Sequence, residues 1–244
     1  METGNQIVIG IPGKWPSRKA IVTDIASKSN GLLFAGLVLM NTATKEGYKL
    51  EVYEHDPHLA KAFEIAGRPR ITEENVQAIR SHTFTLYLIA EGRSPEMAQK
   101  VLNVGCGLLQ AGGIAVRVET TGKAHVAQDW FALAAAKNET ALYHAFVTLI
   151  GSKGVFYSCG MHNLGYRDAI VKGDITPNDA AQLLQTFLLY TLIEKPTLQD
   201  GHTFSETADS PYYRLRSVSC ETYERDHTFF NPFGMWQLET IHRK

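Results

Sequence analysis

The sequence predicts an α+β protein with mixed sheets, in which a ferredoxin-like N-terminal half packs on a second α+β half. Two observations favour this class. Short strand-like apolar runs alternate with helix-like segments through residues 1–122, and the strongest helical pattern of the chain opens much later, at Thr176-Pro177. A division near Gly122 gives halves 1–122 and 123–244, but no linker marks it, so one continuous domain is the alternative.

The first half alternates strands and helices in the order β-α-β-β-α-β-α-β, which is that of a ferredoxin-like unit with additions. Helix starts are marked by Ser17, Thr72 and Ser94, whose side chains can accept hydrogen bonds from the first turn. The expected elements are strand 7–11, helix 17–29, strands 32–40 and 48–53, helices 57–66 and 72–81, strand 83–90, helix 94–111 and strand 114–118.

The second half is expected to mix helices with short strands. An alanine-rich segment predicts a helix over 125–137, and residues 151–154 look like a hairpin turn between strands 142–150 and 155–159. The spacing of 142–150 also fits a helix, so that alternative stays open. The Thr176 helix is expected to run to Ile193, and three short strands follow it.

Composition excludes several classes of protein. The 244 residues carry a net charge of −1 without a basic stripe, which argues against nucleic-acid binding. The longest apolar run, Gly31 to Met40, is far shorter than the about 20 residues of a membrane span. Residues 1–6 lack the regions of a signal peptide. The odd, widely spaced cysteines (Cys106, Cys159 and Cys220) favour a reduced, cytoplasmic protein.

Two glycine-rich motifs superficially resemble nucleotide-binding loops. The segment Gly10–Trp15 is too short for a phosphate loop and lacks the Ser/Thr that would hold magnesium. The glycines of Gly105–Gly107 fall inside a helix, whereas a dinucleotide site needs them at a helix start. We therefore expect no cofactor.

The densest group of reactive side chains follows the strand 155–159. Cys159, Gly160, Met161 and His162 have the C-x-x-H spacing that one metal ion could bridge, although a structural zinc site needs four ligands. Cys159 and His162 could instead be a nucleophile and its base, with Asp168 or Asp200 orienting the imidazole. A buried structural loop is the third alternative, because free cysteine is commonly buried.

A second polar turn contains Asp200, His202 and Thr203. If the fold brings it beside the first loop, His162 and Asp168 join Asp200 and His202 in a cluster suited to a divalent metal or to acid–base chemistry. Otherwise these residues simply form a tight Asp-Gly turn.

The segment His227–Trp236 is rich in aromatic side chains. Such a segment usually completes a core, which we favour. The alternative is an exposed patch for a protein partner or a second copy of the chain in a homodimer.

Four motifs together carry a family resemblance. They are Cys159–Gly165 followed by Asp168, Leu198–Phe204, Ser210–Tyr212 and Asn231–Trp236. In these motifs the chain resembles an uncharacterised bacterial family, catalogued as the domain of unknown function number 4261, mainly over residues 140–240. The resemblance implies a bacterial, soluble protein and provides no catalytic residue to carry over.

We therefore expect a non-catalytic binding or protein-interaction protein, whose 159–168 loop and 200–204 turn recognise an unknown small ligand or protein partner. That hypothesis expects Asp168→Ala to leave the fold intact and to abolish a contact. The alternative is a hydrolase that uses the His/Asp cluster with a divalent metal or an activated water, so whether the protein is an enzyme stays open.

Overall fold

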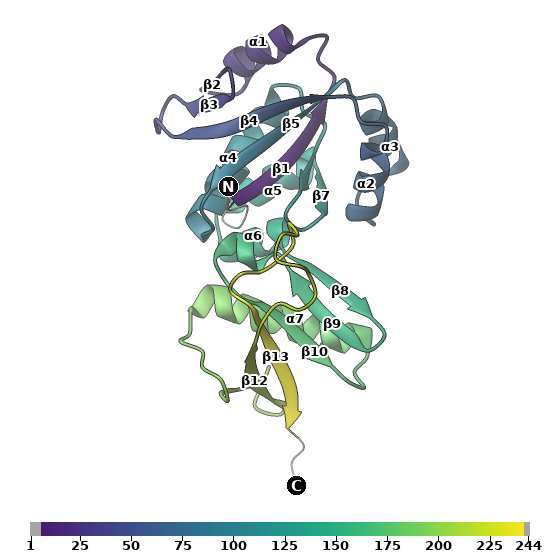
Figure 1. The fold of residues 1–244 in the computed structure, drawn as a ribbon, viewed down its shortest axis with the longest axis vertical. Coiled ribbons are helices and arrows are strands. Elements are labelled where there is room, and N and C mark those ends of the chain that lie inside the picture. Colours follow the sequence, from purple (N-terminus) through teal and green to yellow (C-terminus); the bar gives the residue numbers. More distant parts are fainter. Residues whose placement is uncertain (1–5, 242–244) are drawn as a thin grey trace.

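The computed structural model describes residues 6–241, in which seven α-helices and two sheets confirm the α+β class. The two sheets lie at opposite ends of an elongated molecule, with the helix α6 (Glu139–Phe146) between them (Figure 1). Residues 1–5, which bear on the signal-peptide expectation, lie outside the described part. No helix within residues 6–241 is long and apolar enough to cross a membrane.

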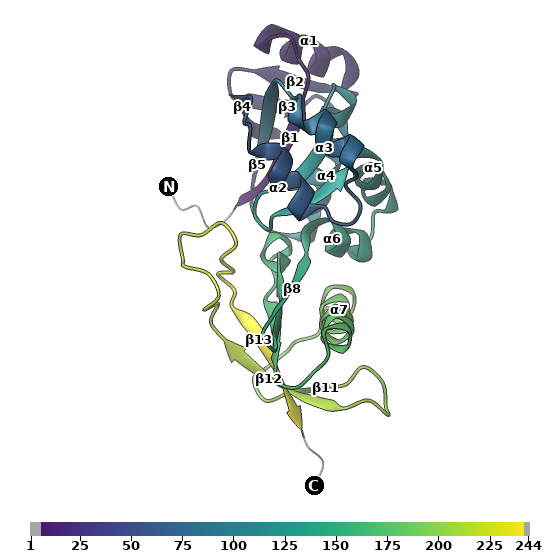
Figure 2. The ribbon, with the colours of Figure 1, turned by 90° about the vertical axis from the view of Figure 1, so that its right-hand side faces the viewer.

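The sheet of the first half has seven strands in the order β2-β3-β4-β5-β1-β6-β7, and every pairing is antiparallel. Helices α4 and α5 lie on one side of it, and the central strands carry no helix on the other (Figure 2). The strands are β1 (Gln6–Gly13), β2 (Leu32–Ala35), β3 (Val38–Asn41), β4 (Gly47–Glu54), β5 (Phe84–Glu91), β6 (Ala115–Val118) and β7 (Lys123–Val126). The helices are α1 (Arg18–Lys28), α2 (Leu59–Ala66), α3 (Glu73–Arg80), α4 (Pro95–Gln110) and α5 (Ala127–Ala136).

Two expectations for the segments that form this sheet and its helices were wrong. The single strand expected over 32–40 is a hairpin of β2 and β3, because Gly36 takes a positive φ of 63° and reverses the chain. The helix expected from His125 begins two residues later, because Lys123–Val126 pairs with β6 as a further strand.

The sheet of the second half has six strands in the order β11-β12-β13-β10-β9-β8. It is mixed, because β10 and β13 run parallel while its other pairings are antiparallel. The helix α7 (Pro177–Glu194) packs against this sheet. The strands are β8 (Thr148–Ser152), β9 (Val155–Cys159), β10 (Asp168–Lys172), β11 (Thr203–Phe204), β12 (Tyr212–Val218) and β13 (Met235–Ile241).

The hairpin and the three late strands of this half are confirmed, with corrections. The segment 142–150, for which both a strand and a helix were open, contains one of each. The helix α6 ends at Phe146, and the strand β8 begins at Thr148. Strand β10 was not expected. Its first residue, Asp168, is the last residue of the loop expected over 159–168, and it pairs with Met235.

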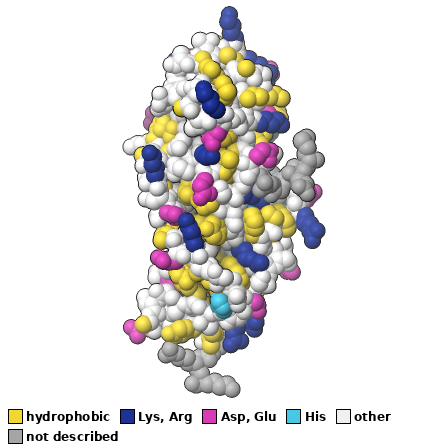
Figure 3. Space-filling view, turned by 90° about the vertical axis from the view of Figure 1, so that its left-hand side faces the viewer, with side chains coloured by type: hydrophobic (Ala, Val, Ile, Leu, Met, Phe, Trp, Pro, Cys, Tyr) yellow, Lys and Arg dark blue, Asp and Glu magenta, His cyan; other side chains and the backbone are white. Residues whose placement is uncertain are grey.

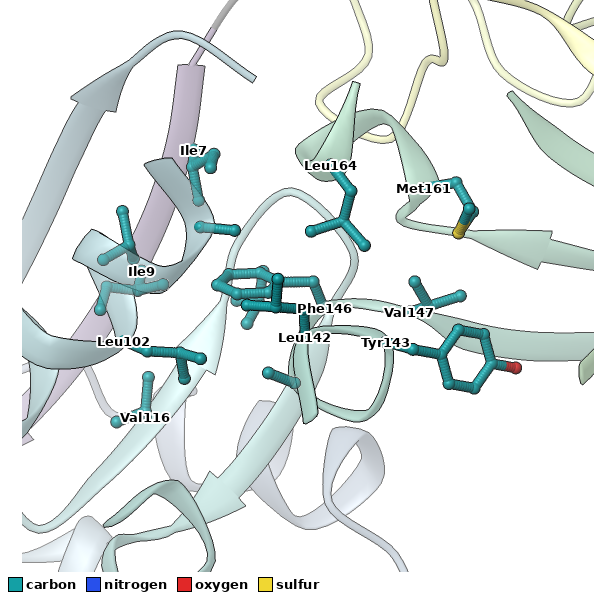
Figure 4. Close-up of a cluster of buried hydrophobic side chains, with 14 of the residues drawn as sticks. Ile7, Ile9, Leu102, Val116, Leu142, Tyr143, Phe146, Val147, Met161 and Leu164 are labelled. Carbon is teal, nitrogen blue, oxygen red and sulfur yellow. The ribbon is translucent and has the colours of Figure 1, made fainter. Parts of the chain in front are cut away.

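Buried apolar side chains of the described residues form three clusters, and the largest includes members of both halves. Figure 4 shows Phe146 of α6 between Ile9 and Leu102 of the first half and Leu164 of the second. On the face in Figure 3, charged side chains of both signs are interspersed.

Candidate functional site

The loop after β9 is a compact buried turn. The chain leaves Cys159, reverses at Gly160, forms the short 3-10 helix η2 (Met161–Leu164) and enters β10 at Asp168. Gly160 has a φ of 126°, and a Cβ there would lie 2.1 Å from the carbonyl oxygen of Phe146. Only glycine therefore fits at the point where the loop meets α6.

Asp168 is the centre of a buried hydrogen-bond network, which we call the Asp168 hub: Asp168, Ser158, Asn231 and the backbone N–H of Met161. The Ser158 hydroxyl (2.7 Å) and the Met161 N–H (3.2 Å) donate to Oδ1 of Asp168, and the Asn231 amide (2.6 Å) donates to Oδ2. The hub joins β9, η2, β10 and the loop that precedes β13. Its carboxyl group is committed to holding these segments together.

His162 lies beside the hub but is not part of it. Its Nδ1 is 3.8 Å from Oδ2 of Asp168, which is longer than a hydrogen bond, and neither ring nitrogen has a hydrogen-bond partner. The side chain is fully buried, so a substrate cannot reach it. The neighbouring Asn163 accepts a hydrogen bond of 2.8 Å from Thr120 and so links the loop to the first half.

Cys159 is placed as a structural residue. It is 1 % exposed, and burial raises the pKa of its thiol, with a smaller contribution from Asp168. Its sulfur lies 4.0 Å from the carbonyl oxygen of Phe229. A catalytic cysteine needs a lowered pKa and an adjacent base, and this environment provides the opposite.

The second predicted turn lies elsewhere. Asp200 is exposed, where it accepts hydrogen bonds from the Ser217 N–H (2.8 Å) and from Arg216 (3.1 Å). The hydrogen bond from the Ser217 backbone N–H, followed by that from the Arg216 side chain, lowers the pKa of the Asp200 carboxyl group. His202 and Thr203 are exposed and line a different cavity, of about 410 Å³, beside α7.

The structure thus brings His162 and Asp168 together but gives neither a contact with Asp200 or His202. Over the described range 6–241, no three His, Cys, Asp or Glu side chains are arranged to hold a metal ion. Of the eight candidate site residues, Cys159, Gly160, Met161, His162 and Asp168 are buried, and Asp200, His202 and Thr203 are exposed.

The aromatic segment is divided between core and surface. Met235 and Trp236 are buried, as the core prediction expects, while Phe233 is exposed. The Arg167 guanidinium lies 4.9 Å from the Trp236 ring centroid and donates a hydrogen bond of 2.7 Å to Ser217.

A different cavity, of about 440 Å³, gathers basic side chains that the sequence analysis did not connect. We call it the Lys123 pocket. It lies between the turn after α2, strand β7 and helices α5 and α6. Its ionisable lining residues are Arg68, Arg70, Lys123, His125, His144 and Asp129.

The Lys123 ammonium has an unusual environment within this pocket. It donates a hydrogen bond of 2.7 Å to the carbonyl oxygen of Val147, and desolvation lowers its pKa to about 8. Burial, followed by the charge of Lys123, lowers the pKa of both His125, to about 4, and His144. The pocket therefore disfavours additional positive charge.

No spacing signal could have revealed this pocket. His125 and His144 have no ligand spacing in the sequence, and Lys123 begins β7, a strand that was not expected. The residues meet through the packing of α2, α5 and α6 on β7 and of α5 on α6.

Together, the fold and these sites define an α+β protein whose most reactive-looking loop is an internal structural element. A family model described as "Domain of unknown function (DUF4261)" matches residues 157–236 and confirms the resemblance over that segment. The segment contains the entire Asp168 hub. No curated protein and no solved structure matches the chain.

Proposed function

We propose that the protein is a non-catalytic binding protein that takes an anionic group, a carboxylate or a phosphate, in the Lys123 pocket. One observation carries the proposal: the desolvated Lys123 ammonium is bonded to a backbone carbonyl, and no described carboxylate forms an ion pair with it. A shielded cation without a counter-ion is costly, and an incoming anion would offset that cost.

The remaining lining residues support an anionic ligand. Arg68 and Arg70 add positive charge, and Asp129 is the one carboxylate among the lining residues. Asp129 already bonds Arg70, at 3.1 Å from each of its oxygens. The cavity volume lies within the range of about 300–1,000 Å³ that small-ligand pockets have.

The hydrolase alternative has less support. It needs His162, Asp168, Asp200 and His202 to converge on a substrate or a metal ion. The first two are buried, while Asp200 is bonded to residues of β12.

The proposal is tested by titrating the protein with inorganic phosphate and with acetate while the Lys123 side chain is observed by NMR. We expect saturable binding that raises the pKa of Lys123 above about 8. The affinity for phosphate or acetate should fall as the pH rises above the pKa of Lys123, because the neutral amine no longer attracts the anion.

Lys123→Gln should abolish the binding, and Lys153→Gln, at an exposed turn, is the matched control. Equal binding by the Lys123→Gln variant, or no saturable shift with either anion, would exclude the anion site.

Further assignments stand as proposals beside this one. The ferredoxin-like assignment is supported by the adjacent antiparallel strands β4, β5, β1 and β6. A bacterial, cytoplasmic protein is supported by the family resemblance and by three free cysteines.

A homodimer is supported by exposed apolar side chains on the β2–β3 hairpin, namely Leu33, Leu37, Val38 and Met40. Native mass spectrometry tests for the homodimer.

A further inference from the structure

The outer face of the seven-stranded sheet contains a second cavity, of about 470 Å³, which we call the sheet-face pocket. Alternation along the strands decides which side chains reach it. On β5, Leu86 and Leu88 point into the core, so Thr85 and Tyr87 point to the opposite face. This is the face that has no helix over its central strands (Figures 1 and 2).

A glycine in β1 lets two lining side chains of this pocket lie close to the sheet. Gly10 pairs with Tyr87 of β5, and a Cβ at Gly10 would lie 3.0 Å from the Tyr87 ring. It would also lie 2.7 Å from Oε1 of Glu119, so both side chains extend over the glycine. A second ring, that of Tyr53 on β4, meets Tyr87 edge-on with centroids 5.4 Å apart. The pocket thus has aromatic walls.

The charges that line the sheet-face pocket are all negative. Its ionisable lining carboxylates are Glu51, Glu54, Asp56 and Glu119, and neither Lys nor Arg is among its lining residues. Nearby cations partly balance two of these, since Lys49 pairs with Glu51 at 2.6 Å and Arg117 pairs with Glu119. Glu54 and Asp56 form no ion pair with any described residue.

Two buried polar atoms at this pocket have no hydrogen-bond partner. One is the hydroxyl of Thr85, a lining residue that is 1 % exposed and that pairs directly with Tyr53. The other is Oε1 of Glu119. Buried polar groups are rarely left unpaired, so these atoms indicate a missing donor at the base of the pocket.

We propose that the sheet-face pocket binds an organic cation, an alkylammonium or a guanidinium group. Tyrosine faces attract such cations, carboxylates pair with them, and their N–H groups supply the donors that Thr85 and Glu119 lack. An anion would meet four carboxylates, and an apolar group would leave the polar atoms unpaired. The site is distinct from the Lys123 pocket, whose charge has the opposite sign.

The cation can come from a free amine or from an arginine or lysine side chain of a protein. Titration of ¹⁵N-labelled protein with arginine amide, and separately with a capped Ser-Arg-Ser peptide, distinguishes the two sources. The control ligand, called citrulline amide below, is the N-acetylated form, which has nearly the same shape and carries no charge. We expect saturable shifts at Gly10, Thr85 and Tyr87 with the cations and none with citrulline amide.

Variants identify the groups responsible. Glu54 is exposed, so Glu54→Gln keeps the fold and should weaken the arginine amide affinity at least threefold. Tyr87→Leu should weaken it at least fivefold. Glu194→Gln, an exposed change on α7 in the other half, should leave it unchanged.

Tighter binding of the peptide than of arginine amide would identify a protein partner as the source, and the reverse would identify a small amine. Shifts of equal size with citrulline amide, or no shift with any cation, would overturn the proposal. Because the phosphate titration reports on Lys123, failure of either site leaves the test of the other intact.

Discussion

Replacing Asp168 by alanine should destabilise the whole fold rather than remove an external contact. The change leaves three buried donors without their acceptor: the Ser158 hydroxyl, the Met161 N–H and the Asn231 amide. Each such donor costs about 1–3 kcal/mol, although Asn231 keeps a second bond, to the Tyr166 carbonyl oxygen. We therefore expect a loss of about 3–6 kcal/mol, a large part of the about 5–15 kcal/mol that stabilises a typical domain.

The measurement is urea unfolding followed by circular dichroism, with the midpoint and slope compared among variants. Asp174→Ala changes an exposed aspartate near the end of β10 and is the control, with an expected effect below about 0.5 kcal/mol. Asp168→Asn retains one acceptor oxygen and should fall between the two. An Asp168→Ala protein within 1 kcal/mol of the parent would refute the structural role and return Asp168 to the candidates for ligand contact.

Three further outcomes are expected. Gly160→Ala should lower the free energy of unfolding by more than about 3 kcal/mol, because the strain of a positive φ adds to the clash of the new Cβ with Phe146. Gly154→Ala has the same strain but no clash, so it should lower this free energy by about 1 kcal/mol, as measured by urea unfolding. Phe146→Ala should cost about 3–5 kcal/mol and accelerate hydrogen exchange in both sheets; acceleration in one sheet alone would indicate independent halves. The pKa of His125 is lowered from 6.5 to about 4 in the folded protein. As the pH falls from 6.5 to about 4, the unfolded chain takes up this proton before the folded protein does, so the free energy of unfolding should fall by about 3 kcal/mol. His125→Gln should remove that part of the acid sensitivity, and an unchanged pH profile would contradict the assignment.

Local signals in the sequence predicted the starts of the capped helices α1, α3 and α4 correctly, because a cap depends on a few consecutive residues. Ser17 and Ser94 accept hydrogen bonds from Ala20 (3.2 Å) and Met97 (3.1 Å), as expected. The hairpin before Cys159 was predictable for the same reason, since Gly154 sits in its turn.

Features that depend on tertiary pairing could not be predicted in this way. Strand β10 has a polar first residue, and its place in the sheet depends on β13, far along the chain. The density of reactive groups in the 159–168 loop was recognised, but density alone does not separate a site from an internal network. Burial separates them, and burial is a property of the fold.

The parallel pairing of Asp168 in β10 with Met235 in β13 has a consequence for synthesis of the protein. The two residues are separated by about 70 positions, so at roughly 5–20 residues per second β13 is made roughly 3–14 seconds after β10. All seven strands of the first sheet lie within Gln6–Val126 and can assemble before this interval begins. During the interval, β10 exposes an unpaired sheet edge to other nascent chains. Lower growth temperatures, or a chaperone that covers extended segments, should therefore raise the yield of native protein. Substitutions in the N-terminal half should raise it less.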